Sequence, residues 1–200
     1  MLPRHGNGGY RVDPEYVVKV EDHQGKLLWQ PPRYPERTVD PGVSWIMTDM
    51  LREVVDRGTG YLARDPSVGG LSYEIPAAGK TGTTNDNADV WFVGMTPELV
   101  AGVWLGFDKP QTIAPGAAGG TLAAPIWGDM LAHWYQGRTP GAWTPPEGLV
   151  TAELDRDTGQ PATPATPPER RYTEYFLPGT EPGAVKVTPW SIFASGPIVH

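Results

Sequence analysis

The stretch Ala78-Gly79-Lys80-Thr81-Gly82-Thr83-Thr84-Asn85-Asp86 places one cation beside glycine and hydroxyl side chains, directly ahead of an aromatic-rich segment. Side chains alternate along a strand, so Lys80 and Gly82 are predicted to face one way, and Thr81 and Thr83 the other. If the strand lies at a sheet edge, a short anionic peptide aligned along it could meet the backbone of all four residues. Lys80 would supply a positive charge, and Gly82 would permit close approach.

The residues around this stretch predict an antiparallel meander. Three apolar runs, at residues 75–83, 89–95 and 99–107, are separated by short turns and read as consecutive strands. Residues 121–135 then predict a helix that covers the meander through an apolar face. That face is expected to contain Leu122, Ile126, Met130, Leu131 and Trp134.

Two further elements are predicted upstream. Residues 16–20 and 26–29 indicate a hairpin with glycine in its turn. A helix should begin with Asp40 as its N-cap and Pro41 at its first position, and it should end near Gly58. Its buried face is expected to contain Val43, Ile46, Met47, Met50, Leu51, Val54 and Val55.

Together these elements predict an α+β fold, an antiparallel sheet packed by helices, over residues 1–137. Ten of the 23 prolines lie between Pro140 and Pro189, so residues 138–200 are expected to form a Pro-rich, extended C-terminal tail. The apolar and aromatic residues Tyr172, Tyr175, Phe176 and Leu177 could dock this tail on another surface.

Composition narrows the possible functions. The net charge is −7, and Arg170-Arg171 is the only adjacent basic pair, which disfavours nucleic acid as a partner. There is no cysteine, the four histidines are scattered, and no cofactor motif is present, so no metal or cofactor is expected. No membrane-spanning run and no signal peptide is found in the sequence.

Gly79-Lys80-Thr81 imitates the end of a phosphate-binding loop. That motif requires a glycine where this chain has Glu74, and it requires a helix where this chain has a turn, which excludes nucleotide binding.

Several motifs in order resemble class A penicillin-binding proteins. They are Gly8-Gly9-Tyr10, Arg57-Gly58-Thr59-Gly60, the stretch from Ala77 to Asp86, residues 89–97 and 103–108, Gly119-Gly120-Thr121 through Trp127, and Glu174-Tyr175-Phe176 through Pro182. Lys80-Thr81-Gly82 matches one of the three signature elements of penicillin-recognising serine enzymes. The resemblance covers most of the chain.

The resemblance implies the C-terminal part of a serine β-lactamase/transpeptidase-like domain, followed by a tail. Such enzymes cross-link peptidoglycan stem peptides: a serine attacks a D-Ala-D-Ala end, and an amine resolves the acyl-enzyme. β-Lactams mimic that end and inhibit the enzyme. Carried over by motif position, Lys80 and Thr81 would hold the substrate or drug carboxylate, Thr83 would give hydroxyl and amide contacts, and Gly82 clearance. The family acts on the periplasmic, extracytoplasmic face of the inner membrane.

The chain departs from the family in its catalytic motifs. None of its five serines is followed by lysine three positions later or by asparagine two positions later, so the nucleophile, its lysine and the Ser-x-Asn element are absent. We therefore expect a fragment of a longer protein that is inactive alone, needs the remainder of the transpeptidase domain, and leaves Trp-rich strands exposed. The alternatives are a non-catalytic module that binds a peptidoglycan peptide or partner strand, and a β-lactamase or sensor relative.

Overall fold

The computed structural model describes residues 6–13, 15–32 and 35–183. The chain divides into two compact units, Met1–Thr144 and Pro145–His200, and the boundary expected from the sequence at residue 137 lies within the first. The end of the predicted tail, residues 184–200, lies outside the described residues.

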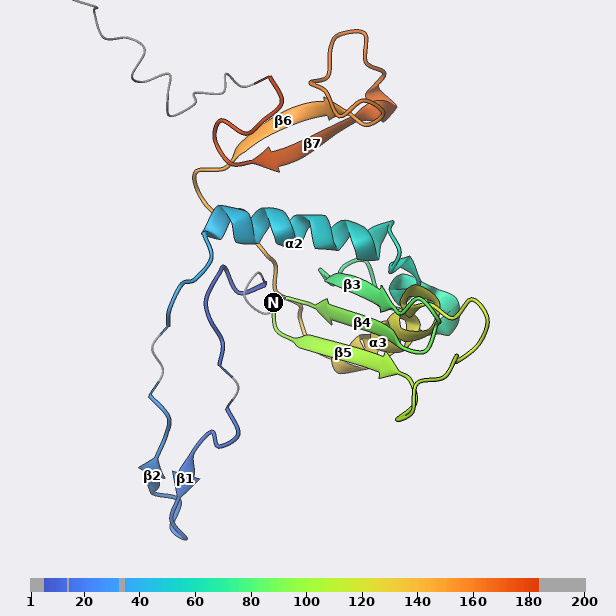
Figure 1. The fold of residues 1–200 in the computed structure, drawn as a ribbon. Helices are drawn as coiled ribbons and strands as arrows, with labels where there is room; N and C mark the ends of the chain where they lie inside the picture. Colours follow the sequence, from blue (N-terminus) through green and yellow to red (C-terminus); the bar gives the residue numbers. More distant parts are fainter. Residues whose placement is uncertain (1–5, 14, 33–34, 184–200) are drawn as a thin grey trace, which may run out of the picture. The chain divides into compact units, whose positions relative to one another are not determined.

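The first unit is built on the predicted meander (Figure 1). Its strands are β3 (Ala78–Thr83), β4 (Val90–Met95) and β5 (Val100–Leu105), which pair antiparallel in the order β3-β4-β5. The register places Thr81 opposite Phe92, and Phe92 opposite Val103. Strand β3 therefore forms one edge of the sheet, as expected from the sequence.

One face of the sheet carries the core. A π-helical turn, η3 (Gly119–Ala123), leads into α3 (Ala124–Trp134), which packs on this face (Figure 1). The fully buried rings of Phe92 and Trp127 meet edge to face at 5.2 Å between centroids, and Trp127 Nε1 donates to the Ala101 carbonyl at 3.1 Å. Removing a buried ring of this size costs roughly 3–5 kcal/mol. The contact therefore holds α3 to the sheet.

The predicted apolar face of α3 was only partly right. Leu131 is buried, but Ile126 and Met130 are exposed, and the other buried residues of the helix are Ala124, Trp127 and Gly128. A Cβ at Gly128 would lie 2.0 Å from the Ala63 carbonyl oxygen. The helix meets its neighbour η1 (Tyr61–Arg64) through small residues at close range, so apolar size alone did not identify the buried side.

The predicted start of the upstream helix is confirmed in α2 (Pro41–Asp56). The Asp40 carboxylate accepts from the N–H groups of Gly42 and Val43 at 2.8 and 3.1 Å, which satisfies two free donors of the first turn. No helix among the described residues is long and apolar enough to cross a membrane.

The predicted buried face of α2 needs correction. The buried residues are Gly42, Ser44, Trp45, Thr48, Leu51 and Val55, whereas Val43, Met47 and Met50 are exposed. Thr48 can be buried because its hydroxyl donates to the Ser44 carbonyl at 2.9 Å within the helix. Leu51 packs with Ala78 and Met95, which seats α2 against the start of β3.

The opposite face of the sheet is more open. Trp91 and Trp104 are 45% and 44% exposed, with ring centroids 6.1 Å apart. Their exposure agrees with the expectation of uncovered Trp-rich strands. The predicted hairpin is also confirmed, as β1 (Val20–Glu21) paired antiparallel with β2 (Leu27–Trp29).

A buried arginine fixes the segment that leads into β3, which contains the short turn η2 (Pro66–Val68). Arg64 is only 5% exposed, and its Nε donates to Asp56 at 2.7 Å. Its Nη1 donates to the Ser72 carbonyl at 2.7 Å, and both terminal nitrogens reach the Ile75 carbonyl at 3.3 Å. The guanidinium thus ties the approach to β3 to the end of α2.

Glu98, in the turn between β4 and β5, holds the chain that follows α3. Its carboxylate accepts from the Tyr135 hydroxyl and, at 2.6 Å, from the Gly141 N–H. Burial of the ring, together with the hydrogen bond to Glu98, raises the pKa of Tyr135 to about 12. The phenol therefore stays protonated and can donate to Glu98 at every physiological pH.

The second unit contains more structure than the predicted extended tail. Strands β6 (Val150–Asp155) and β7 (Arg171–Phe176) form an antiparallel pair, and the short turn η4 (Pro168–Arg170) precedes β7. Proline is confined to the connection between the strands and to the flanks, so it does not interrupt the ladder.

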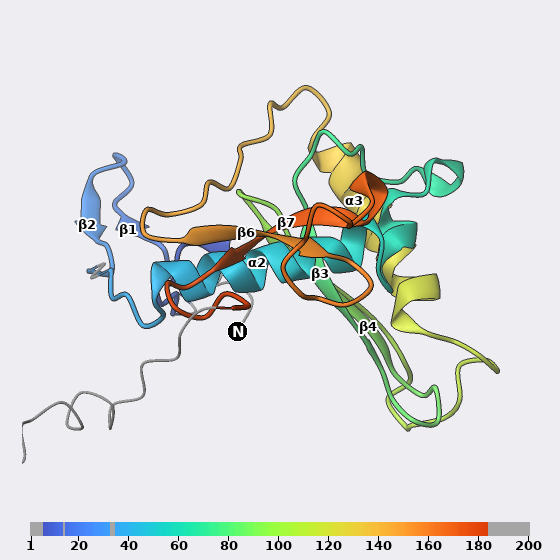
Figure 2. The same cartoon turned by 90° about the horizontal axis from the view of Figure 1, so that it is seen from above.

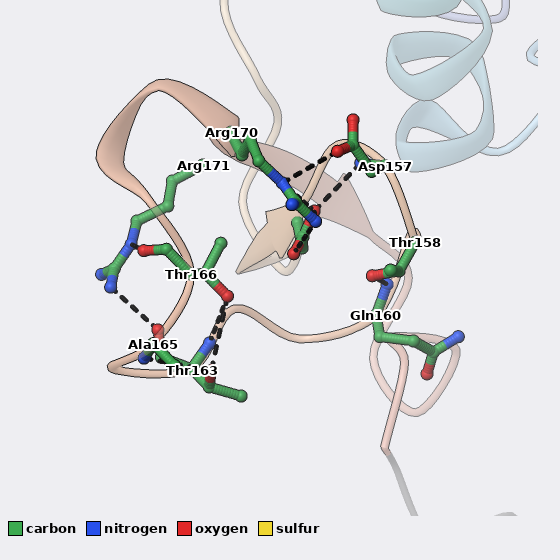
Figure 3. A network of polar contacts seen from close by, with 9 residues as sticks. Asp157, Thr158, Gln160, Thr163, Ala165, Thr166, Arg170 and Arg171 are labelled. Carbon is green, nitrogen blue, oxygen red and sulfur yellow. Dashed lines mark hydrogen bonds and ion pairs between the residues drawn. The ribbon is translucent and has the colours of Figure 1, made fainter.

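The basic pair of the sequence holds this connection together (Figure 3). Arg170 Nη2 donates to both carboxylate oxygens of Asp155, at 2.8 and 2.7 Å, and its Nε lies 3.0 Å from Asp157. Arg171 donates to the carbonyls of Thr166 and Thr163 at 2.9 and 2.8 Å. Both arginines are thus used within the unit, which gives the pair a structural role.

We expect the second unit to lose stability in acid through Asp155. The hydrogen bond from Arg170 lowers the pKa of Asp155 below its ordinary value of 3.8. A carboxylate with a lowered folded-state pKa stabilises fully above about pH 4, and the contribution is lost as pH falls through the folded-state pKa. The NMR amide signals of the unit should therefore show unfolding that steepens below about pH 4.

The substitution Asp155→Asn should lower the stability of the unit at pH 7 and flatten this acid response. Asp157→Asn is the matched control, because the more exposed Asp157 makes a single ion pair to the same arginine. Equal effects of the two substitutions would contradict the assignment to Asp155.

Candidate functional site

The predicted site residues lie together along the outer half of β3. Ala78 and Gly79 are buried, whereas Lys80 and Thr83 are exposed and Thr81 and Gly82 are partly exposed. The buried first residues of β3 pack against α2 and anchor the strand. The remaining residues of β3 extend beyond α2 along the edge of the sheet (Figures 1 and 2).

The direction of the backbone groups follows from the ladder. Thr84 N–H donates to the Asp89 carbonyl at 3.0 Å, in the same register as the β3–β4 pairs. Hydrogen-bonding direction alternates along an antiparallel strand, so Lys80 and Gly82 turn their N–H and C=O groups toward β4. Thr81 and Thr83 turn theirs to the open edge. The expectation that an edge ligand meets the backbone of all four residues was therefore wrong, because two of them are committed to β4.

Lys80 supplies the positive charge of this edge. Its exposed Nζ donates to the Thr81 carbonyl at 2.9 Å, one of the groups that faces outward. An ammonium has three donors, so two remain for an anionic group placed along the strand. The side chain thus brings its charge to the open edge of the backbone.

The hydroxyl of Thr83 is held by the start of η3. Gly119 N–H donates to Thr83 Oγ1 at 3.1 Å. A Cβ at Gly119 would lie 2.2 Å from the Trp91 carbonyl oxygen and 2.6 Å from that of Gly82, so only glycine allows this approach. The contact joins residues 36 positions apart, and the sequence reading did not anticipate it.

The hydroxyl of Thr81 meets a second threonine. Thr59 Oγ1 lies 2.9 Å from Thr81 Oγ1, and either atom could be the donor. Arg57-Gly58-Thr59-Gly60 is one of the motifs that resemble the family, but nothing in the sequence predicts a role for Thr59. Thr59 follows α2, so the two hydroxyl contacts come from different elements.

The turn beyond β3 is braced by the loop that follows β5. Ile113 N–H donates to the Asn87 carbonyl at 3.0 Å, and the Thr112 hydroxyl donates to the Asp86 carbonyl at 3.0 Å. Asp89 accepts from Trp104 Nε1 at 2.9 Å, so it acts at the turn and not as a free carboxylate. Within the described ranges, no group of histidine and acidic residues is arranged to hold a metal ion.

Comparison with known families decides the relationship. The sequence profile of the penicillin binding protein transpeptidase domain matches residues 1–132. The chain belongs to this transpeptidase family. A second profile, the C-terminal domain of penicillin-binding protein 1A, matches residues 145–187. The resemblance inferred from the sequence motifs is thereby confirmed.

Individual relatives of this transpeptidase domain agree. Penicillin-binding protein 1A of Pseudomonas aeruginosa is 31% identical over 96% of this chain and 28% of its own length. The Neisseria flavescens protein of the same name is 40% identical over 72% of this chain and 18% of its own length. The chain thus spans less than a third of either relative.

A solved structure gives the same fold. The crystal structure of penicillin-binding protein 1A from Haemophilus influenzae superposes with a TM-score of 0.76 at 22% identity, covering 93% of this chain and 32% of that one. The predicted α+β class is confirmed. That Lys80, Thr81, Gly82 and Thr83 hold a ligand stays a prediction.

We expect Gly119→Ala to break the hydrogen bond between Gly119 N–H and the Thr83 hydroxyl and to destabilise the first unit. The added methyl group would overlap the Trp91 and Gly82 carbonyl oxygens, so η3 must shift and release Thr83. Overpacking of this kind costs roughly 1–3 kcal/mol. Urea unfolding followed by circular dichroism should show the loss, and the Thr83 amide should shift in NMR spectra.

Gly102→Ala is the matched control. A Cβ there would find its nearest neighbour at an ordinary 3.6 Å, from Val93. If Gly102→Ala destabilised the chain as much as Gly119→Ala, the close contact of Gly119 would not be the cause.

Proposed function

We propose that the edge of β3 holds the D-Ala-D-Ala end of a peptidoglycan stem peptide in a D,D-transpeptidase site. The parent enzyme would cross-link stem peptides through an acyl-serine intermediate. This chain would supply the substrate-holding strand, and a Ser-x-x-Lys and a Ser-x-Asn element would come from the remainder of the transpeptidase domain. Family membership supports the reaction class, and the chain's own five serines match neither element.

The single observation that carries the proposal is the outward direction of the Thr81 and Thr83 backbone beside Lys80. An extended peptide can add to such an edge through main-chain hydrogen bonds. The Lys80 charge then favours a ligand that ends in a carboxylate. A carboxyl-terminal dipeptide satisfies both requirements.

Each residue has a distinct part in this proposal. Lys80 and the Thr81 hydroxyl hold the carboxylate. The N–H of Thr83, turned to the edge, bonds the carbonyl oxygen that gains charge when a serine attacks, as one half of an oxyanion hole. Gly82 has no side chain on the sheet face that it shares with Lys80, which keeps the ligand's path clear.

The partners follow from this assignment. β-Lactams would bind the same edge as mimics of the D-Ala-D-Ala end. The remainder of the domain would complete the site, and the parent would act at the periplasmic, extracytoplasmic face of the inner membrane. The boundaries that we propose for the parts are residues 1–137 for the transpeptidase portion and 138–200 for the C-terminal extension.

A second candidate is a non-catalytic module that binds a D-Ala-terminated peptide or a partner's strand at the same edge. The open edge and the absence of a Ser-x-x-Lys pattern in this sequence favour it for the chain alone. A β-lactamase or sensor relative is less well supported, because the match at residues 145–187 is to a penicillin-binding protein domain.

Peptide binding tests the proposed edge directly. A peptide ending in D-Ala-D-Ala should shift the amide signals of Thr81 and Thr83 in NMR titrations, with a dissociation constant on the order of 1 mM for so few contacts. Lys80→Ala should weaken binding about tenfold, because a charge-assisted hydrogen bond contributes about 1.5 kcal/mol. The control Lys26→Ala removes an exposed lysine of the β1–β2 hairpin and should have no effect. Unchanged affinity in Lys80→Ala would contradict the assignment.

Covalent labelling separates the strand's role from catalysis. We expect the 200-residue chain to take no covalent label from a fluorescent penicillin, because no serine in it has the lysine needed for activation. The measurement is in-gel fluorescence after denaturation, with an intact penicillin-binding protein as the positive control. Clear labelling of this chain would show that it carries its own nucleophile and would overturn the proposal.

A further inference from the structure

We infer that Thr59 is a positioning residue that turns the Thr81 hydroxyl proton toward the ligand's carboxylate. The inference rests on the proposed function of the β3 edge. It starts from the 2.9 Å contact between the two hydroxyl oxygens, which leaves open which of them donates.

The position of Thr59 is fixed on both sides by glycine. A Cβ at Gly58 would lie 2.8 Å from the Val54 Cα, and one at Gly60 would lie 2.8 Å from the Phe92 ring. Gly60 N–H also donates to the Val54 carbonyl at 2.8 Å, which closes the turn after α2. Thr59 is thus presented from a turn packed onto the core.

A third glycine closes the turn from the other side. A Cβ at Gly120 would lie 2.0 Å from the Thr59 carbonyl oxygen, so the backbone of η3 presses on Thr59 directly. The same Cβ would lie 3.6 Å from Thr81 Cγ2. Thr59, Thr81 and η3 therefore meet at one point, and the backbone of the exposed residue Thr59 has little freedom to move away.

The hydroxyl of Thr83 is held in a way that can be compared with the hydroxyl of Thr81. The Thr83 hydroxyl accepts from Gly119 N–H, which can only donate. One of the two acceptor lone pairs of the Thr83 hydroxyl is thus used by the protein, and the hydroxyl proton is left to point elsewhere. No backbone N–H of the described residues donates to the Thr81 hydroxyl, and Thr59 takes that place.

The chemistry of the ligand decides the direction of the Thr59–Thr81 bond. An ionised carboxylate only accepts hydrogen bonds, and a hydroxyl has a single proton to donate. If Thr81 donated to Thr59, it would present lone pairs to the carboxylate. If Thr59 donates, Thr81 is free to donate, and the chain from Thr59 through Thr81 to the carboxylate polarises each bond in turn.

A purely structural hydrogen bond predicts something different. A bond that only ties the turn to β3 would affect stability and all ligands alike. A positioning residue affects ligands with a carboxylate and spares those without one. The two roles are therefore separable with a matched pair of ligands.

The experiment uses the 200-residue chain and two probes, a peptide ending in D-Ala-D-Ala and the same peptide with a C-terminal amide. Thr59→Val removes the hydroxyl at nearly constant shape, and Thr59→Ser retains it. Thr180→Val is the control, since it removes an exposed hydroxyl that donates to a backbone carbonyl in the second unit. Affinities come from NMR titration, and the Thr81 χ1 rotamer comes from three-bond couplings.

We expect Thr59→Val to weaken binding of the carboxylate peptide roughly three- to tenfold, the loss of one ordinary hydrogen bond. Its affinity for the amide peptide should be unchanged, and Thr81 χ1 should change from one rotamer to an average. Thr59→Ser and Thr180→Val should behave as the unsubstituted chain.

Equal weakening for both peptides, or a fixed Thr81 rotamer with unchanged affinity, would overturn the inference. If the unsubstituted chain bound neither peptide, the proposed function would fail. The Thr81 rotamer in Thr59→Val would then still show whether Thr59 holds the Thr81 side chain, and an unchanged rotamer would contradict the inference. Should Thr59→Val fail to fold, Thr59→Ala replaces it with the same two peptides and the same couplings, and equal weakening for both peptides would contradict the inference.

Discussion

The ring of Phe92 is the contact on which the first unit depends. It lies opposite Thr81 in the ladder and meets Trp127 of α3 edge to face. A Cβ at Gly79 would lie 2.6 Å from this ring, and one at Gly60 2.8 Å from it. The strand β3, the turn that carries Thr59 and the helix α3 thus all pack on one aromatic side chain, and close packing transmits any change there to the site.

The backbone hydrogen-bonding groups of β3 are divided between the neighbouring strand β4 and the open edge of the sheet. Lys80 and Gly82 use their backbone groups to join β4, while Thr81 and Thr83 keep theirs at the edge. The threonine hydroxyls are held from behind by Thr59 and Gly119. The strand is therefore rigid on the protein side while it keeps donors for a ligand, which is the preorganisation that recognition requires.

Much of this fold could be read from local sequence. Asp40-Pro41 marks the start of α2 because capping is decided within a few residues, and the meander follows from alternating runs and short turns. The buried faces of α2 and α3 could not be read in this way. Thr48 and Gly128 are buried because of a hydrogen bond within the helix and a close contact with a neighbouring backbone, which apolar periodicity does not register.

The same limit applies to the site and to the second unit. Lys80-Thr81-Gly82-Thr83 is contiguous, so one motif predicts it, but Thr59 and Gly119 reach it across 22 and 36 positions of sequence. Proline content suggested an extended tail after residue 137. The β6–β7 pair forms nevertheless, because the charges of Arg170 and Arg171 organise the connection in place of a large apolar core.

The alternation of backbone direction along β3 fixes the distance between the groups that face the open edge. Two residues of an extended strand span about 7 Å, so the outward groups of Thr81 and Thr83 are set one dipeptide apart. A partner strand has the same repeat, and it can engage both positions only in steps of two residues. The edge of β3 therefore fixes the register of a bound strand in steps of one dipeptide, and the charge of Lys80 selects the step at which a terminal carboxylate is bound.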